Sequence, residues 1–263
     1  MLIFFVLMAE AFAGYLLPWG QMSYWGAQVI ISLFGAIPVV GDAIVEFIRG
    51  DYSISDITLN RFFALHVIAL PLALIALVFV HIVALHEVGS NNPDGIEIKK
   101  NKGPDGVPLD GIAFHPYHTS KDLVAILIFL MIFSAVVFFA PEMGGYFLEH
   151  ANFEPANLRA TPEHIAPVWY FTPFYAILRA VPDKLWGFIL FGLSVVLPVS
   201  LPWLDRSRVR SIRYRGWMYK SALTVFVITF LTLGWLGVQP AEGVYVLLAR
   251  IFTVLYFAFF LLM

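Results

Sequence analysis

The stretch RFFALHVIALPLALIALVFVH, residues 61–81, decides the fold of this chain. It is almost wholly apolar and has the length of about 20 residues that a helix needs to cross a bilayer. Its two histidines, His66 and His81, are 15 residues apart, which in a helix is a rise of about 22 Å and a turn of about 60°. A kink or tightening at Pro71 would reduce that angle. Both imidazoles are therefore predicted to face a bundle interior, one near each membrane surface.

The composition agrees with a membrane protein. Of the 263 residues, 60% are hydrophobic and 13% are charged, which is about half of the charged fraction of roughly 25% found in soluble domains. The chain has no cysteine, which excludes disulfides, thiolate metal ligands and covalent attachment of a haem through cysteine. The solvent for much of the chain is therefore predicted to be lipid.

Six apolar runs are candidates for membrane spans. They are residues 1–17, 61–85, 123–140, 185–204, 219–237 and 243–263. Between the first two, residues 24–37 and 44–48 are typical of amphipathic helices that lie on the membrane surface. The sequence predicts an all-α fold, a multi-helix transmembrane bundle of about six spans with amphipathic surface helices in the outer loops.

The distribution of Lys and Arg predicts the orientation of these spans. The loops 87–119 and 205–218 are basic and are separated by two spans, so both are predicted on the cytoplasmic side. The loops 18–60 and 141–183 carry mainly acids and are predicted to share the outer side. The four assignments agree with one another.

The two histidines are the candidate functional groups of the bundle. An imidazole in hydrocarbon is costly unless it has a partner, and neutral imidazole is a good axial ligand for haem iron. His66 and His81 are therefore predicted to hold two haems in a column across the bilayer, although hydrogen bonds to neighbouring helices are an alternative. Gly14 either lets a porphyrin edge approach the first helix or serves ordinary helix packing.

Several motifs occur in the same order as in one known family. GYLLPWGQMSYWGA at 14–27, the histidine helix, LHEVGSNNP at 85–93, FHPYHTSKD at 114–122 and PVWYFTPFYAILRAVP at 167–182 follow one another. Together they resemble cytochrome b, the haem-bearing subunit of the ubiquinol–cytochrome c oxidoreductase (cytochrome bc) complex, and the long polar loop resembles bacterial members. The resemblance implies three parts, whose bounds are 1–90 (the C-terminal part of the haem-binding domain), 91–119 (a cytoplasmic loop) and 120–263 (the C-terminal domain).

The resemblance also implies a function, cofactors and partners. Ubiquinol would be oxidised near the outer surface and a quinone reduced near the inner one, with electron transfer through two b haems and proton translocation. The enzyme would be a ubiquinol–cytochrome c reductase in the bacterial inner (plasma) membrane. Its partners would be a Rieske-type iron–sulfur protein and a c-type cytochrome, and the complex would be a homodimer. No nucleic-acid partner is expected. The second axial ligand of each iron is expected from two helices that precede this chain in the family. The chain is thus expected to be a fragment that also lacks the extreme C-terminus.

Site residues carry over from the family motifs by position. His66 would ligate the outer haem and His81 the inner one. The inner quinone site would comprise His86, Ser90, Lys121 and Asp122. The outer quinol site would comprise Tyr15, Gly26, Pro167, Val168, Trp169, Tyr170 and Tyr175. Helix-end solvation and interfacial anchoring of aromatic rings are the plainer interpretations of these residues.

Two departures from the family pattern affect these expectations. Most members have a proton-accepting Glu where this chain has Val168, and valine cannot accept a proton. Glu163 or His164 could replace it if the loop folds back, although Glu163 could equally be a surface acid. The spacing from His66 to His81 is one residue longer than in mitochondrial members.

Two other classes of function remain open at the level of sequence. A membrane transporter or channel also uses broken helices and intramembrane ionisable groups. It would show an inverted repeat, and none is evident. An inactive fragment that folds but is unable to hold haem alone is the other alternative. A visible haem spectrum would separate these classes from the redox subunit.

Overall fold

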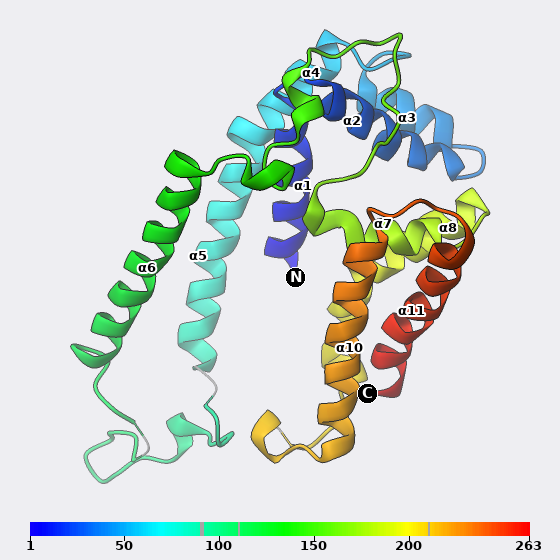
Figure 1. The fold of residues 1–263 in the computed structure, drawn as a ribbon. Helices are drawn as coiled ribbons and strands as arrows, with labels where there is room; N and C mark the ends of the chain where they lie inside the picture. The colour runs from blue at the N-terminus through cyan, green and yellow to red at the C-terminus, as the bar shows by residue number, and fades with distance from the viewer. Residues whose placement is uncertain (90–91, 110, 210) are drawn as a thin grey trace. The chain divides into compact units, whose positions relative to one another are not determined.

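The computed structural model describes the chain except for residues 90–91, 110 and 210 (Figure 1). The described residues form helices and two isolated β-bridges. They fall into two compact units. The first comprises Met1–Val80, His150–Arg208 and Gly216–Met263, and the second comprises His81–Glu149 and Val209–Arg215.

Five of the described helical segments are long and apolar enough to cross a membrane. They are Asp56–Val88 (α4, Asp56–Ala64; η2, Leu65–Ala69; α5, Leu70–Val88), Tyr117–Phe139 (α6), Lys184–Leu204 (α8, Lys184–Val196; η7, Leu197–Ser200; α9, Leu201–Leu204), Trp217–Leu236 (α10) and Gly243–Leu262 (α11). The apolar helix α1, Leu2–Leu16, is shorter. The predicted helical transmembrane bundle is confirmed, with five spans and one shorter helix in place of about six spans. The chain is a multi-pass membrane protein.

Helices α1, α2 (Gln21–Leu33), α3 (Gly41–Arg49) and α4 pack around one of the two cores of the first unit. This core consists of Ala13, Leu16, Tyr24, Ala27, Ile31, Ile54 and Phe62. Local signals set the helix ends. Gly50 closes α3 in the left-handed conformation with φ of 77°, and a capping box between Ser55 and Thr58 opens α4. The segments predicted as amphipathic surface helices are therefore helical, as α2 with η1 (Phe34–Ala36) and as α3, and their place on a membrane surface stays a prediction.

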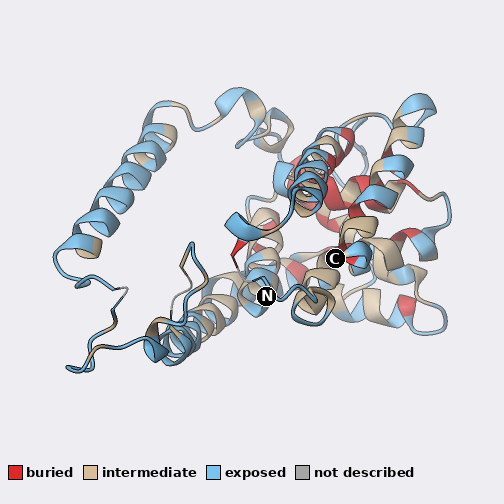
Figure 2. Ribbon diagram, turned by 90° about the horizontal axis from the view of Figure 1, so that it is seen from below, coloured by how far each residue is buried: buried red, intermediate tan, exposed pale blue. Residues whose placement is uncertain are grey.

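Helices α7 (Thr172–Arg179), α8, α10 and α11 form the other core of the first unit. This core consists of Ala176, Ile177, Ala180, Leu233, Leu236, Ala249, Tyr256 and Phe260. The Arg179 side chain donates to the carbonyls of Leu236, Gly237 and Gln239 at 2.9–3.0 Å, which fixes α7 at the end of α10. Among the described residues, every buried hydrophobic one belongs to the first unit, and Figure 2 shows these residues in red.

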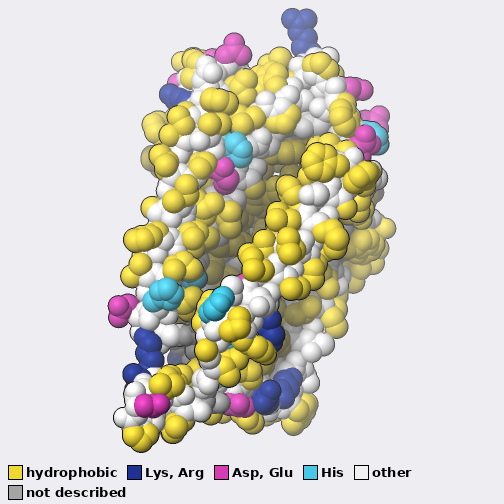
Figure 3. All heavy atoms as spheres, turned by 90° about the vertical axis from the view of Figure 1, so that its left-hand side faces the viewer, with side chains coloured by type: hydrophobic (Ala, Val, Ile, Leu, Met, Phe, Trp, Pro, Cys, Tyr) yellow, Lys and Arg dark blue, Asp and Glu magenta, His cyan; other side chains and the backbone are white. Residues whose placement is uncertain are grey.

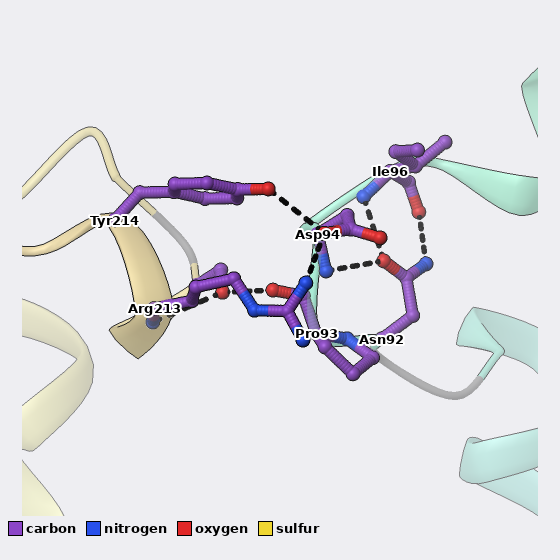
Figure 4. A network of polar contacts seen from close by, with 7 residues as sticks. Asn92, Pro93, Asp94, Ile96, Arg213 and Tyr214 are labelled. Carbon is purple, nitrogen blue, oxygen red and sulfur yellow. Dashed lines mark hydrogen bonds and ion pairs between the residues drawn. The ribbon is translucent and has the colours of Figure 1, made fainter.

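The second unit contains the end of α5, the polar segment that follows it, α6 and the residues Val209–Arg215. Asp94 accepts hydrogen bonds from Arg213 Nη1 at 2.9 Å and from the Tyr214 hydroxyl at 2.8 Å (Figure 4). Ser211 Oγ donates to the Pro93 carbonyl in the same network. These bonds join the two basic loops to each other. Such a contact is compatible with the prediction that both loops lie on the same side of the membrane.

Helix α6 exposes an apolar surface of the kind that lipid covers. None of its residues is buried, and large apolar side chains such as Leu127, Phe129 and Met131 are exposed along it. Hydrophobic side chains cover most of the helical surface that faces the viewer in Figure 3. A soluble helix has a polar face opposite its core, whereas residues 123–139 of α6 are apolar on all sides, as expected of a helix in lipid. Short helices complete the second unit (η3, Ile98–Lys100; η4, Met143–Gly145; η8, Ile212–Tyr214) and the first (η5, His150–Phe153; η6, Trp169–Phe171).

Candidate functional site

His66 is held by the helix α1 that packs beside it. Its Nδ1 atom lies 3.0 Å from the backbone oxygen of Glu10 and 3.1 Å from Oε1 of the same residue. The imidazole is partly exposed, with 34% of its side-chain surface accessible. A ring whose Nδ1–H is held in this way keeps the lone pair of Nε2 for another partner, which is the usual arrangement of a histidine that ligates a metal.

Gly14 makes room for this imidazole. A Cβ atom built on Gly14 would lie 2.4 Å from Cε1 of His66 and 2.8 Å from Nδ1. Real Cβ atoms do not approach other heavy atoms so closely, so the ring and the α1 backbone touch only because the residue is glycine. The close neighbour of Gly14 is thus the histidine that was predicted to ligate the outer haem.

His66 lies in a π-helical turn, η2, rather than in a regular α-helix. The backbone N–H of Leu70 donates to the carbonyl of Leu65, five residues earlier. A π-turn accommodates one additional residue in a helix, and such turns are frequent at functional sites. If one of the 15 steps is absorbed, the remaining 14 leave the two histidines about 40° apart in azimuth. A π-turn in this helix would therefore reduce the angle between the two histidines, which was the effect expected of a kink at Pro71.

The inner candidates all belong to the second unit and are exposed where they are described. His81, His86 and Asp122 are exposed, and Ser90 lies outside the described residues. Lys121 Nζ bonds to the hydroxyl of Tyr117 and lies 4.1 Å from the centre of its ring. The described contacts include no bond between His86 and Asp122, so the proposed grouping of these side chains stays a prediction.

Lys99 is a residue of this region that the sequence interpretation passed over. Its Nζ donates to the backbone carbonyls of His86, at 2.7 Å, and Glu87. These carbonyls are in the last turn of α5, where a cation is favoured by the helix dipole. The basic run at 99–102 was a signal for such a cap, but it did not indicate which lysine would reach the helix.

The outer candidates line two neighbouring cavities beneath the loop that precedes α7. The larger cavity, about 210 Å³, is lined by Met8, Ala9, Phe12, Gly26, Val29, Ile30, Leu33, Ile165, Pro167, Phe171, Tyr175, Leu178 and Phe191. The smaller cavity is lined by Tyr15, Leu16, Ser23, Ala27, Ala166 and Val168 together with residues of the larger one. Phe12, Gly26, Ile30, Pro167 and Phe171 line both. The structure thus places Tyr15, Gly26, Pro167, Val168 and Tyr175 in the walls of these two cavities, and their role in quinol binding stays a prediction.

Two predicted residues, Trp169 and Tyr170, do not line these cavities. Their exposed fractions are 52% and 37%, and their rings contact each other edge to face at 5.3 Å. The partial burial of Tyr170 raises the pKa of its hydroxyl above the ordinary value. Phe171, the next residue, faces both cavities, because the short helix η6 turns successive side chains in different directions.

The loop over the cavities is fixed to α2 by polar contacts. The Gln21 side chain donates to the Ala160 carbonyl at 3.2 Å and accepts from the Asn157 backbone at 2.8 Å. Asn152 Oδ1 accepts from the Ser23 backbone N–H at 2.9 Å. Glu163 and His164, the two candidate proton acceptors, follow this anchored segment and are exposed. Neither is among the residues that line the cavities.

These features define a class of protein: a helical membrane protein with a histidine held by a neighbouring helix within a candidate span, and with an apolar cavity between helices. Family models agree with this class. One described as "Cytochrome b(N-terminal)/b6/petB" matches residues 1–173, and one described as "Cytochrome b(C-terminal)/b6/petD" matches residues 155–257. The chain belongs to the cytochrome b family.

Individual relatives agree with the family models. The chain is similar to cytochrome b of Allochromatium vinosum, with 60% identity over 99% of this chain and 65% of the relative. It is 50% identical to cytochrome b of Rickettsia bellii over 99% of this chain and 62% of that protein. A solved structure titled "Hyperthermophilic respiratory Complex III" has a TM-score of 0.88 and 40% identity over 98% of this chain and 66% of that one. The chain spans less than two thirds of the length of these curated relatives.

Proposed function

We propose that this chain is a haem-bearing membrane subunit of respiratory electron transfer, which takes part in ubiquinol oxidation near the outer surface and quinone reduction near the inner one. The observation that carries the proposal is His66, an intramembrane imidazole whose Nδ1 faces two oxygen atoms of Glu10. A histidine in hydrocarbon is costly in free energy unless it has a partner or a function. This geometry and the family membership favour ligation of iron through Nε2 as that function.

The residues present fit two b haems. His66 has an oriented imidazole, and the neighbouring Gly14 has no side chain that would compete for the space beside it. His81 is on the same continuous helix, and its exposed imidazole is open to a ligand. Each of the two histidines would hold one haem through a ring nitrogen. Bound there, the haems would supply one-electron carriers between the two membrane surfaces.

The outer cavities are the proposed ubiquinol site. Their walls are almost wholly apolar, which suits a quinol ring and the start of an isoprenoid tail. The hydroxyl-bearing residues among their walls are Tyr15 and Ser23 in the smaller cavity and Tyr175 in the larger one. Because Val168 cannot take a proton, we propose Glu163 or His164 as the acceptor, at the exposed end of the anchored loop.

The Glu163 proposal predicts a kinetic effect. We expect Glu163→Gln to slow quinol oxidation by roughly tenfold, because a general base contributes at least about that factor, and to change its pH dependence. The matched control is Glu154→Gln, which removes an acid from the same loop. Steady-state rates across pH measure both variants. An unchanged rate profile for Glu163→Gln would remove this residue from the proton path.

The inner quinone site is proposed to comprise His86, Lys121 and Asp122, with Ser90. A histidine and a protonated aspartic acid can donate to the two quinone carbonyls and deliver protons to them. We expect Asp122→Asn to slow re-oxidation of the haem pair by quinone by about tenfold or more, with haem content unchanged. Flash-induced haem kinetics measure this, and Asp105→Asn in the same unit is the control. Equal kinetics in both variants would contradict the assignment.

The proposal also covers the membrane in which the subunit resides and its partner subunits. We propose that it resides in the bacterial inner membrane and works within a ubiquinol–cytochrome c reductase, with a Rieske-type iron–sulfur protein, a c-type cytochrome and a homodimeric complex. The division at 1–90, 91–119 and 120–263 would separate haem binding, the cytoplasmic loop and the quinol-site domain.

One spectrum tests the proposal as a whole. The membrane complex that contains this chain is expected to show a reduced-minus-oxidised b-type haem band with two components that titrate separately. A complex free of haem would contradict the proposed function and favour a transporter or channel instead.

A further inference from the structure

Glu10 is an unusual residue in its helix. It is the one charged residue in α1, whose other members are apolar or small. A carboxylate in a membrane helix is costly, and such residues are retained where they have a partner or a function. Glu10 is partly buried, with 20% of its side-chain surface accessible. Its Oε2 atom is buried and has no hydrogen-bond partner among the described residues.

Glu10 presents two acceptors to one ring nitrogen. The Nδ1–H of His66 faces both the backbone oxygen, at 3.0 Å, and the side-chain Oε1, at 3.1 Å. The backbone oxygen alone would orient the imidazole, as carbonyls do for many metal-ligating histidines. The carboxylate is therefore not needed for orientation, and what it adds at this position is negative charge.

We propose that Glu10 is a positioning residue that lowers the reduction potential of the iron ligated by His66, through the hydrogen bond to Nδ1. The inference rests on the proposed function, because it needs a haem on His66. A carboxylate that accepts from Nδ1–H makes the imidazole a stronger electron donor, which stabilises the oxidised iron. The unpartnered Oε2 leaves that charge without compensation from another described side chain.

A purely structural role is the competing explanation. The bond between Glu10 and His66 also links α1 to η2, and it satisfies two polar groups in an apolar setting. Such a link would change the stability of the helix pair when removed, but it would leave the potential of a correctly ligated iron unaltered. The reduction potential therefore separates the two roles.

The test is a potentiometric titration of the assembled membrane complex with Glu10→Gln. Glutamine has nearly the same size and retains both a side-chain oxygen and the backbone carbonyl, so only the charge is removed. We expect the ratio of oxidised to reduced iron at the His66 haem to fall by about tenfold at a fixed potential, which is a rise of about 59 mV for one electron. The haem on His81 is expected to keep its potential, which provides an internal control.

Two further variants make the test decisive. Glu46→Gln removes an exposed acid from α3 and should shift neither haem. Glu10→Asp keeps the charge but withdraws it by one methylene, so its potential should lie between those of the wild type and Glu10→Gln. An unchanged potential in Glu10→Gln, or loss of the His66 haem in both Glu10 variants, would overturn the inference. A wild-type complex without haem would instead overturn the proposed function.

Discussion

Replacing His66 with alanine is expected to remove one of two b haems and to leave the other. The imidazole is the group that α1 orients with two oxygen atoms of Glu10, and alanine has no atom that can bind iron. The b-type haem per complex should fall by about half, because His66 and His81 are each proposed to hold one of two haems. Pyridine haemochrome content and a redox titration with a single remaining component measure this loss.

His81→Ala is the counterpart of this variant and should remove the other component. It should leave quinol docking in the outer cavity intact, because no residue of the second unit lines that cavity. His118→Ala, a change of a partly buried histidine near the start of α6, is the matched control and should retain both haems. A His66→Ala complex with two full haem components would contradict the ligand assignment.

The main elements of the fold could be predicted because membrane spans depend on local composition. Apolar runs of about 20 residues are helices wherever they meet lipid, so α6, α10 and α11 were found within a few residues of their observed ends. The amphipathic segments that became α2 and α3 were found for the same reason. These helices could be predicted without knowing which other segments they pack against.

Contacts between distant segments could not be predicted in this way. Glu10 was visible as a lone acid in an apolar run, which is a signal of function, yet nothing local indicated that it meets a histidine 56 residues later. The π-turn at Leu65–Ala69 was likewise hidden. Pro71 signals a disturbance of the helix, but the form of the disturbance depends on how α1 packs against the turn.

The outer cavity likewise has features that could be predicted from the sequence and features that could not. The motif residues Pro167 and Val168 were identified from their resemblance to a family pattern, and the structure places both in cavity walls. Trp169 and Tyr170 belong to the same motif but are turned away, whereas Phe171 faces both cavities. Side-chain direction in a short irregular helix depends on tertiary packing, which a motif does not encode.

Gly26→Val is expected to impair quinol oxidation strongly while leaving both haems in place. Gly26 lines both outer cavities, and a Cβ at this position would meet only the Tyr15 ring, at 4.0 Å. A valine therefore has room in the folded chain, but its methyl groups would occupy the space proposed for the quinol ring. Filling a packed site with such groups costs about 1–3 kcal/mol, which corresponds to a rise in KM for ubiquinol of about fivefold to a hundredfold.

The rise in KM for ubiquinol should increase with the size of the side chain at position 26. Gly26→Ala adds one carbon in ordinary contact with Tyr15 and should change KM less than Gly26→Val does. Gly192→Val is the matched control, because a Cβ at Gly192 in α8 meets no atom within 4 Å and the residue does not line either cavity. Haem spectra and the rate of haem reduction by quinol separate binding from folding. Equal KM values for Gly26→Val and Gly192→Val would show that quinol binds elsewhere, since a substrate in these cavities cannot share their volume with the valine.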